Sequence, residues 1–418
     1  MKLLYTFAIH LFTLALKLAS PFYKKAKQLN RGRKSTWNVL KKIHPDDKVV
    51  WIHAASLGEF EQGRPIIEAI RNEKSEYKIL LSFFSPSGYE IRKNYNLADW
   101  VVYLPADTAA NAKRFIKDAH PSMSFFVKYE FWYHYYATLA VNRIPVYSVS
   151  SIFRNNQVFF KWYGKWFRKT LKAVDKFYVQ DEKSGALLTG IGITNFTVAG
   201  DTRFDRVAAI AALASEVPVA KQFATTNKVL IAGSTWAPDE AILAEYINSA
   251  VDDVKMIIAP HETDEAHVAQ IMKRFTAPAL RYSQRESINN PEAYRVLVID
   301  TIGLLSAIYR YGTVACIGGG FGKGIHNTLE AATFGMPVVF GPNHKKFREA
   351  IDLLACGGGF TFNNYDDFRK IMDMLWNSAS LNALTEAGEA AGNYVKNMCG
   401  ATALIMNDAF YKYNNEQS

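Results

Sequence analysis

The chain has 418 residues, which is long for one ordinary hydrophobic core and fits two domains of typical size. Hydrophobic residues make up 49% of the chain and charged residues 21%, a balance that excludes wholesale disorder. The three cysteines, Cys316, Cys356 and Cys399, lie far apart and form no metal-ligand spacing. A disulfide scaffold and a structural zinc site are therefore disfavoured, and a reducing compartment fits.

The formal net charge of +10 would suggest a nucleic-acid-binding protein if it were spread over the folded body. Residues 1–45 contain ten of the 49 Lys and Arg residues and none of the 39 Asp and Glu residues. The rest of the chain thus carries as many basic as acidic residues. A nucleic-acid partner is not expected, because the basic stripe that such a partner requires is missing from the body.

The basic stretch follows an apolar run, residues 3–16, that only Thr6, His10 and Thr13 interrupt. An apolar run with a basic flank is typical of a segment held at a membrane, with its Lys and Arg facing the anionic cytoplasmic surface. Because a full span needs about 20 residues, a helix lying at the interface is at least as good an interpretation as a spanning one. A surface helix packed on its own domain and a cleaved signal peptide are the alternatives.

Beyond residue 48, short apolar runs rich in β-formers alternate with helical stretches such as 59–71 and 109–119. This alternation predicts a parallel sheet with helices on both faces. The strands expected in the first half are residues 49–55, 79–84, 100–104, 123–127, 145–150 and 176–179.

After Asp205 the pattern weakens into an Ala-rich connection, and a second series of strands and helices follows. Two successive αβ sets predict two Rossmann-like domains that face each other across a cleft. Ligands of such sheets bind at the carboxyl ends of the strands, so we expect the site in the turns that follow them. The strands expected in the second half are residues 228–232, 255–259, 295–299, 314–317 and 337–340.

Five parts are predicted along the chain. A membrane anchor with its basic flank (1–34) precedes the first Rossmann-like domain (35–205). A connection (206–226) leads to the second Rossmann-like domain (227–395). The long helical pattern at 381–413 is interrupted at 397–400, and the last helix (396–418) is expected to pack back on the first domain.

The first expected strand runs into the segment 53–59 (HAASLGE), which places Glu59 in the first turn of a helix. A carboxylate there could act as a general base on an acceptor hydroxyl. The spacing of Ser56 and Glu59 equally fits a capping box, in which both side chains only satisfy backbone N–H groups. Spacing alone favours the capping interpretation, because helix starts greatly outnumber active sites.

A glycine-rich segment, 317–324 (IGGGFGKG), lies between a strand and a helix expected to begin near His326. Glycines such as Gly319 let backbone amides approach a ligand, and a helix start favours phosphate. Glu330 could then hold a ribose diol. The alternative is a tight turn followed by an ordinary helical Glu. Neither a dinucleotide fingerprint nor a P-loop is matched.

Three weaker motifs also follow strands: 259–262 (APHE), 300–303 (DTIG) and 200–205 (GDTRFD). Singly, each is more often a turn or a cap than a site. The sequence contains no D-x-D metal signature, and a monophosphate leaving group needs less charge neutralisation than a diphosphate. We therefore expect neither a metal nor another cofactor.

Taken together, these motifs resemble the 3-deoxy-D-manno-octulosonic acid (Kdo) transferase family over nearly the whole chain. The agreement covers residues 31–34 (RGRK), 53–59 (HAASLGE), 85–88 (SPSG), 103–105 (YLP), 130–132 (EFW), 200–205 (GDTRFD), 300–303 (DTIG) and 324–332 (GIHNTLEAA). The resemblance implies the two-domain GT-B glycosyltransferase fold. It also implies transfer of Kdo from CMP-Kdo to a lipid A precursor at the cytoplasmic face of the inner membrane, in lipopolysaccharide biosynthesis.

The resemblance assigns Glu59 as the catalytic base and Arg203 as the basic residue that stabilises the transition state. The residues implied to bind CMP are Pro260, His261, Ile302, Gly303, Leu304, Gly319, His326, Asn327, Thr328, Leu329 and Glu330.

Several positions depart from the family pattern. Leu304 replaces a Glu, His261 an Arg, and Arg203 a Lys, while Lys128 stands where many members have a carboxylate. Glu130 is the candidate that could replace that carboxylate. The alternative enzyme is another GT-B transferase or an epimerase that uses a UDP-sugar, and the alternative of another class is a non-catalytic membrane scaffold on the same fold.

Overall fold

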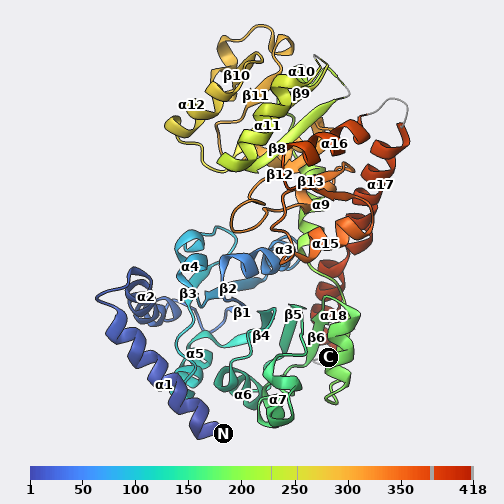
Figure 1. The fold of residues 1–418 in the computed structure, drawn as a ribbon. Coiled ribbons are helices and arrows are strands. Elements are labelled where there is room, and N and C mark those ends of the chain that lie inside the picture. The colour runs from blue at the N-terminus through green and yellow to red at the C-terminus, as the bar shows by residue number, and fades with distance from the viewer. Residues whose placement is uncertain (227, 252, 377–380, 416–418) are drawn as a thin grey trace. The chain divides into compact units, whose positions relative to one another are not determined.

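The computed structural model describes residues 1–226, 228–251, 253–376 and 381–415, and the chain divides into two compact units (Figure 1). The first unit comprises Met1–Asp205 and Gly400–Ser418, and the second comprises Arg206–Cys399. Each unit contains one seven-stranded parallel sheet with helices against it, which confirms the predicted pair of Rossmann-like domains.

The sheet of the first unit has the strand order β3-β2-β1-β4-β5-β6-β7. The chain moves outward from β1 to β3 and then returns to the other side of β1, so the strand order reverses between β1 and β4. The strands are β1 (Lys48–Ala54), β2 (Tyr77–Phe83), β3 (Trp100–Tyr103), β4 (Pro121–Val127), β5 (Val146–Ser151), β6 (Lys176–Val179) and β7 (Phe196–Val198).

Helices cover both faces of this sheet and bury most of its side chains. The fully buried run of β1 after Lys48 agrees with a strand covered on both sides. The principal helices are α1 (Lys2–Ala19), α2 (Lys24–Leu40), α3 (Leu57–Glu73), α4 (Pro86–Arg92), α5 (Ala109–Ala119), α6 (Tyr133–Val141), α7 (Arg168–Leu171), α8 (Glu182–Thr189) and α18 (Ala401–Asn415).

The last helix, α18, belongs to the core of the first unit although it is separated from the unit's sheet by the whole second unit in sequence. Ile405, Met406 and Phe410 are buried in one hydrophobic cluster with side chains of β1, β2 and α3. The ring of Phe410 lies 5.3 Å from that of Tyr77 and 6.3 Å from that of Phe125. The chain therefore has to return to the first unit to complete its core.

The sheet of the second unit repeats this topology with the order β10-β11-β9-β8-β12-β13-β14, so the strand order reverses between β8 and β12. Its strands are β8 (Val229–Thr235), β9 (Lys255–Pro260), β10 (Ala279–Arg281), β11 (Val296–Val298), β12 (Val314–Ile317), β13 (Val338–Phe340) and β14 (Gly359–Thr361). The principal helices are α9 (Arg203–Leu213), which begins at the end of the first unit, α10 (Pro218–Phe223), α11 (Ala237–Ser249), α12 (Glu265–Arg274), α13 (Leu305–Ile308), α14 (Leu329–Ala332), α15 (Arg348–Ala355), α16 (Tyr365–Leu375) and α17 (Leu381–Met398).

All eleven strands expected from the sequence coincide with strands of the structure; ten agree within two residues at each end, and β8 extends three residues beyond the expected end at 232. The structure adds β7, β10 and β14, each three residues long and each at the edge of its sheet. Each of these edge strands is only partly buried and contains a polar residue or a glycine, so it lacks the continuous apolar run by which the equally short β11 and β13 were predicted. The long C-terminal helical pattern breaks at Gly400, whose φ of 113° no helix allows.

The unit boundary lies after Asp205, where the first predicted domain ends. The region 206–226 is not an extended linker, because it contains α10 and most of α9. The return to the first unit comes at Gly400, four residues later than the predicted start of the last helix at residue 396.

Helix α1 is long and apolar enough to cross a membrane, judged by length and composition. It lies against the first unit: the Tyr5 hydroxyl donates to Asp107 Oδ2 at 2.6 Å, and Thr6 Oγ1 lies 2.9 Å from His134 Nε2. Its other side is exposed and apolar, with Leu3, Leu4, Phe7, Leu11, Leu14 and Leu18 all more than half exposed. An apolar face of this kind is typical of a segment that associates with a membrane.

We expect replacement of Phe410 by Ala to destabilise the first unit by about 3–5 kcal/mol, because it leaves a cavity between α18 and the sheet. Asn407→Ala, at an exposed position of the same helix, should change the stability by less than about 0.5 kcal/mol. Denaturant unfolding of the full chain measures both. Equal stability of the two variants would mean that α18 contributes nothing to this core.

Candidate active site

The reversal of strand order in the first unit brings two segments together at the carboxyl edge of its sheet. Strands β1 and β4 are neighbours and parallel, so the residues that follow them lie side by side. Glu59 follows β1 at the start of α3, and Lys128 and Glu130 follow β4. The topology thus places one basic and two acidic side chains at the point where such sheets bind ligands.

Glu59 is fixed by a backbone hydrogen bond and largely removed from water. Its Oε2 accepts from the N–H of Ala55 at 2.7 Å, and only 7% of the residue is exposed. Ser56, the N-cap of α3, makes no side-chain capping bond. The reciprocal capping box is therefore not formed, and capping alone does not account for this carboxylate.

Burial raises the pKa of Glu59 to about 7, with the negative charge of Glu130 as a second cause. The ammonium group of Lys128 and the hydrogen bond from Ala55 oppose this rise. A carboxyl group with a pKa near 7 is ionised in a large fraction at neutral pH and still basic enough to take a proton from a hydroxyl group. This is the property that a general base requires.

Glu130 is held by two ring systems. Its Oε2 accepts from Trp132 Nε1 at 3.1 Å and lies 3.8 Å from His53 Nε2. His53 is fully buried, and its Nε2 has no hydrogen-bond partner in the described structure. The sequence did not reveal that Glu130 lies beside this unpartnered ring nitrogen.

The other nitrogen of His53 contacts two oxygens of Ser82. Nδ1 lies 2.9 Å from Ser82 Oγ, which already accepts from Trp51 Nε1 at 2.8 Å. The Ser82 hydroxyl hydrogen is therefore available to donate to Nδ1. Nδ1 also lies 3.2 Å from the Ser82 carbonyl oxygen, which can only accept, so the contacts of His53 fit either tautomer of its ring.

Lys128 has a φ of 61°, in the left-handed region that is uncommon for a residue with a side chain. Its N–H donates to the carbonyl of Val149 at 2.9 Å, which holds the turn after β4 in place. Strained backbone of this kind clusters at functional sites. Because its charge lowers the pKa of Glu59, Lys128 belongs to the same site, with a charge opposite to that of the carboxylate implied by the resemblance.

Arg203 is linked to the helix that carries Glu59 through one buried carboxylate. Asp201 accepts from Arg203 Nε at 3.0 Å and from Gln62 Nε2 at 2.7 Å, and Gln62 lies one turn after Glu59 on α3. Asp201 is only 4% exposed, whereas about a third of the Arg203 side chain is exposed. The guanidinium group is thus positioned on one side and accessible on the other.

In the second unit, three aromatic rings stack at the carboxyl edge of the sheet. The Trp236 ring, after β8, lies 4.6 Å from that of His261, and His261 lies 4.5 Å from that of His326. Trp236 Nε1 donates to His326 Nε2 at 3.1 Å, so the hydrogen of His326 is on Nδ1. Burial and the neighbouring His261 lower the pKa of His326, which keeps its ring neutral. The sequence predicted both histidines and missed Trp236, for which the only signal is its position after a strand.

The glycines after β12 allow backbone segments to approach each other closely. Gly319 has a φ of 90°, and a Cβ atom there would lie 2.6 Å from the Gly324 carbonyl oxygen. Its N–H donates to Oδ2 of Asp239, which also accepts from the Trp236 N–H, both at 2.9 Å. Asp239 therefore ties the turns after β8 and β12 together, and the role of Gly319 in nucleotide binding stays a prediction.

Helix α14 begins at Leu329, so the prediction of a helix start near His326 is wrong by three residues. Residues 321–327 form a turn and an irregular segment instead, because this glycine-rich loop is fastened to its own backbone and to Asn343. Glu330 is in the first turn of α14, where it accepts from Ser306 Oγ at 2.6 Å and from Asn327 Nδ2 at 2.9 Å.

The other predicted nucleotide-binding residues fall into two groups. Thr328 and Leu329 are fully buried, so neither residue presents surface to a ligand in this structure. Pro260 ends β9, and residues 302–304 form the turn before α13, in which Ile302 is 91% exposed. The structure places all of these residues after β9, β11 or β12, at the carboxyl edge of one sheet.

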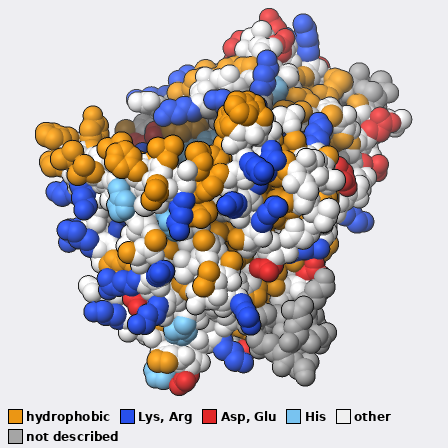
Figure 2. Space-filling model, turned by 90° about the horizontal axis from the view of Figure 1, so that it is seen from below, with side chains coloured by type: hydrophobic (Ala, Val, Ile, Leu, Met, Phe, Trp, Pro, Cys, Tyr) orange, Lys and Arg blue, Asp and Glu red, His pale blue; other side chains and the backbone are white. Residues whose placement is uncertain are grey.

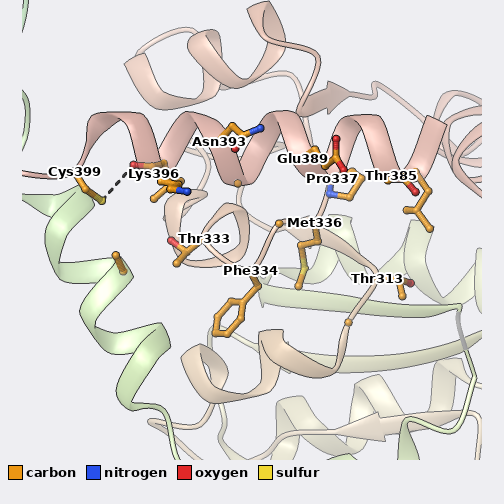
Figure 3. A pocket seen from close by; sticks show the side chains of 17 residues that line it. Thr313, Thr333, Phe334, Met336, Pro337, Thr385, Glu389, Asn393, Lys396 and Cys399 are labelled. Carbon is orange, nitrogen blue, oxygen red and sulfur yellow. Dashed lines mark hydrogen bonds between the residues drawn. The ribbon is translucent and has the colours of Figure 1, made fainter. Parts of the chain in front are cut away.

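A cavity of about 750 Å³ in the second unit lies at the opposite edge of that sheet (Figure 3). Glu389, Asn393 and Lys396 project toward it from α17, and Phe334 and Met336 line it from the segment before β13. None of the predicted site residues lines it.

Within the described ranges no group of three or more His, Cys, Asp or Glu side chains could hold a metal ion, and the expectation that no metal is needed stays a prediction.

Comparison with known proteins points to one family. A family model described as 3-deoxy-D-manno-octulosonic-acid transferase (kdotransferase) matches residues 26–206. A 3-deoxy-D-manno-octulosonic acid transferase of Aquifex aeolicus is 24% identical over 87% of this chain and 98% of its own length. The protein of the same name from Bordetella pertussis is 27% identical over 82% of each chain.

Among solved structures, the chain resembles a UDP-N-acetylglucosamine 2-epimerase from Listeria monocytogenes, described as putative in its name. The TM-score is 0.55 at 13% sequence identity, over 89% of this chain and 97% of that one. Identity this low shows a shared fold of two Rossmann-like domains and nothing about the substrate.

The raised pKa of Glu59 predicts a pH-dependent effect of Glu59→Gln on stability. The folded state keeps a proton that the unfolded chain releases between the ordinary pKa of 4.5 and about 7, so this group lowers the stability as the pH rises through that window. Glu59→Gln removes the penalty and should raise the free energy of unfolding at pH 8 by up to about 3 kcal/mol, with little gain at pH 5. Thermal unfolding at the two pH values measures this difference.

Glu73→Gln is the matched control, because Glu73 is exposed at the end of the same helix. It should leave the unfolding temperature nearly unchanged at both pH values. A stability gain for Glu59→Gln that does not depend on pH would contradict a raised pKa.

Proposed function

Because the chain belongs to the family of Kdo transferases, and is therefore a glycosyltransferase, we propose that it transfers Kdo from CMP-Kdo to a lipid A precursor, with Glu59 as the general base. The observation that carries the mechanistic part is the Glu59 carboxyl group, buried at the strand-order reversal with a pKa of about 7. The donor and the acceptor are those that the sequence resemblance implies.

The proposed reaction inverts the configuration at the anomeric carbon. An acceptor hydroxyl oxygen attacks that carbon and forms the new glycosidic bond, while the bond from the carbon to the phosphate oxygen of CMP breaks and CMP leaves with the electron pair. Glu59 takes the hydroxyl proton. Arg203, held by Asp201 with part of its guanidinium group exposed, stabilises the charge that develops on the phosphate.

Glu130 and Lys128 set the properties of the base. Glu130 makes Glu59 a stronger base by raising its pKa, and Lys128 limits that rise. With both side chains present, Glu59 is ionised in a useful fraction of molecules at neutral pH. This division of roles is compatible with the departure of Lys128 from the carboxylate of the family pattern.

The second unit supplies the proposed CMP site. His261, in a stack with Trp236 and His326, offers a flat surface at the carboxyl edge of the sheet. Glu330 and Asn327 are placed to bind ribose hydroxyl groups by exchanging their bonds to each other and to Ser306 for bonds to the ligand. No metal is included in the proposal, because a monophosphate leaving group needs less charge neutralisation than a diphosphate.

The proposed location is the cytoplasmic face of the inner membrane. The exposed apolar face of α1 supports membrane association, and the ten basic residues before residue 46 would attract both an anionic membrane surface and a phosphorylated acceptor. Lipopolysaccharide biosynthesis is the process in which such an acceptor is used.

The alternative is a transferase or epimerase that uses a UDP-sugar, which the shared fold with the epimerase allows. Incubation with CMP-Kdo and a tetra-acylated lipid A precursor, followed by mass spectrometry of the lipid, tests the proposal. A mass increase by one or more Kdo residues, inhibited by CMP and not by UDP, is the expected result. Inhibition by UDP alone, with no Kdo added, would establish the alternative.

The pH dependence of transfer provides a test of the base. The value of kcat/KM should rise with pH and level off above an apparent pKa of about 7, because only ionised Glu59 accepts a proton. Glu130→Gln should lower this apparent pKa and Lys128→Met should raise it, since each removes one of the two charges that act on Glu59. Glu59→Gln should reduce kcat by about 10²- to 10⁴-fold while CMP still binds.

If both charge variants kept the apparent pKa of the unmodified enzyme, another group would be the base. Near-normal activity of Glu59→Gln would return Glu59 to the role of a helix-start residue.

The nucleotide site is tested by Glu330→Ala. Loss of charge-assisted hydrogen bonds to the ribose should weaken CMP binding by about 1.5–3 kcal/mol, and folding should be little affected because Glu330 contributes no buried apolar surface. Isothermal titration calorimetry with CMP measures the affinity. Glu389→Ala, in the cavity at the opposite edge of the sheet, is the control and should bind CMP normally.

A further inference from the structure

A groove in the first unit gathers basic side chains at the beginning of α1. It has a volume of about 730 Å³ and lies between α5 and α6. Fourteen described residues line it; three are lysines, two are histidines, and none is acidic. The five basic residues are Lys2, Lys113, Lys117, His120 and His134.

Within the described part of the chain, the three lysines of the groove are unpaired. No hydrogen bond or ion pair in the described structure involves the ammonium group of Lys2, Lys113 or Lys117. Lys113 and Lys117 are four residues apart on α5, so they face the same side of the helix, where like charges repel. Nε2 of His120 is a further unsatisfied group, buried without a hydrogen-bond partner.

The acidic side chains near the groove are already engaged. Asp107, beneath it, accepts from Tyr5 and from the N–H groups of His134 and Tyr135. Asp118, on α5, pairs with Arg114 at 3.4 Å. The positive charge of the groove is thus not neutralised by the chain itself, and an anion bound there would satisfy it.

The rest of the groove indicates that this anion belongs to a lipid. Lys2 is the first residue of α1, whose outer side exposes a continuous apolar face. The rim also contains Val141, which is 83% exposed, and Ile144. Figure 2 shows Lys and Arg side chains among apolar ones on the face that carries the beginning of α1, with few acidic side chains between them.

We propose that this groove binds the phosphate-bearing headgroup of an anionic membrane phospholipid. The apolar face of α1 enters the acyl region at the surface of the bilayer, and Lys2, Lys113 and Lys117 then lie at the level of the lipid phosphates. The groove lies outside the catalytic residues Glu59, Glu130 and Arg203. The groove would make binding depend on the negative charge of the membrane, in addition to the insertion of the apolar face of α1.

Flotation of the full chain with lipid vesicles tests this site. Lys113→Gln/Lys117→Gln should bind vesicles of phosphatidylcholine containing phosphatidylglycerol about tenfold more weakly than the unmodified protein. Binding to pure phosphatidylcholine should be unchanged, because α1 is intact. The control Lys273→Gln/Lys370→Gln removes the same charge at two exposed positions of the second unit and should bind normally.

Several results would overturn the proposal. These are equal binding by the groove variant and the unmodified protein, an equal loss in the control variant, or an equal loss on pure phosphatidylcholine. Release by inorganic phosphate beyond that caused by chloride at the same ionic strength would identify a soluble phosphate as the ligand instead. Melting temperatures of all variants show that each is folded, and no outcome depends on the proposed transferase activity.

Discussion

The exclusion of water from the Glu59 carboxyl group is the constraint on which the chemistry of the first unit depends. A carboxylate in water has too low a pKa to accept a proton from a hydroxyl group efficiently at neutral pH. Here the parallel pairing of β1 with β4 brings the first turn of α3 against the segment after β4, and 93% of the residue's surface is covered as a result. The neighbouring charges of Glu130 and Lys128 then adjust a pKa that burial has already raised.

This arrangement requires local features that do not favour folding. A buried carboxyl group with a raised pKa, a lysine with a positive φ and an unpartnered histidine nitrogen all lie around the end of β1 and β4. Each costs free energy that the surrounding core has to offset. The hydrophobic cluster that includes α3 and α18 provides this support, because it holds α3 rigidly against the sheet and with it the position of Glu59.

The central part of both sheets was predictable from the sequence, because strands covered on both faces appear as continuous apolar runs. Strands β7, β10 and β14 were missed because they lie at the sheet edges and are only partly buried, so their sequences are not continuously apolar. The site was predicted as a set of positions after strands. The interactions that give Glu59 its pKa were not, because they depend on the distance between segments some 70 residues apart in the chain.

The limits of the sequence are clearest at the glycine-rich segment. Its composition suggested amides presented to a phosphate, whereas in the structure Gly319 gives its N–H to Asp239 and Gly318 packs against the backbone of Thr235. Glycine composition reports only that something approaches the backbone closely, and here another part of the backbone does so. Trp236 directly follows Thr235 and lies beside His261, but it belongs to no motif that is recognisable in the sequence.

The two units solve the same structural problem in the same way. In each, the strand order reverses beside the first strand of the sheet, and a residue with a side chain adopts a positive φ at a strand end there: Lys128 after β4 and Ser234 in β8. After Lys128 the chain leaves the sheet, whereas Ser234 lies at an irregularity in β8, and Thr235 still pairs with Pro260 before the chain turns away. In the first unit the residues that follow include a second carboxylate, and in the second they begin an aromatic stack. A positive φ near the strand-order reversal thus accompanies a cluster of charged side chains in one sheet and an aromatic stack in the other, although it follows β4 in the first unit and lies within β8 in the second.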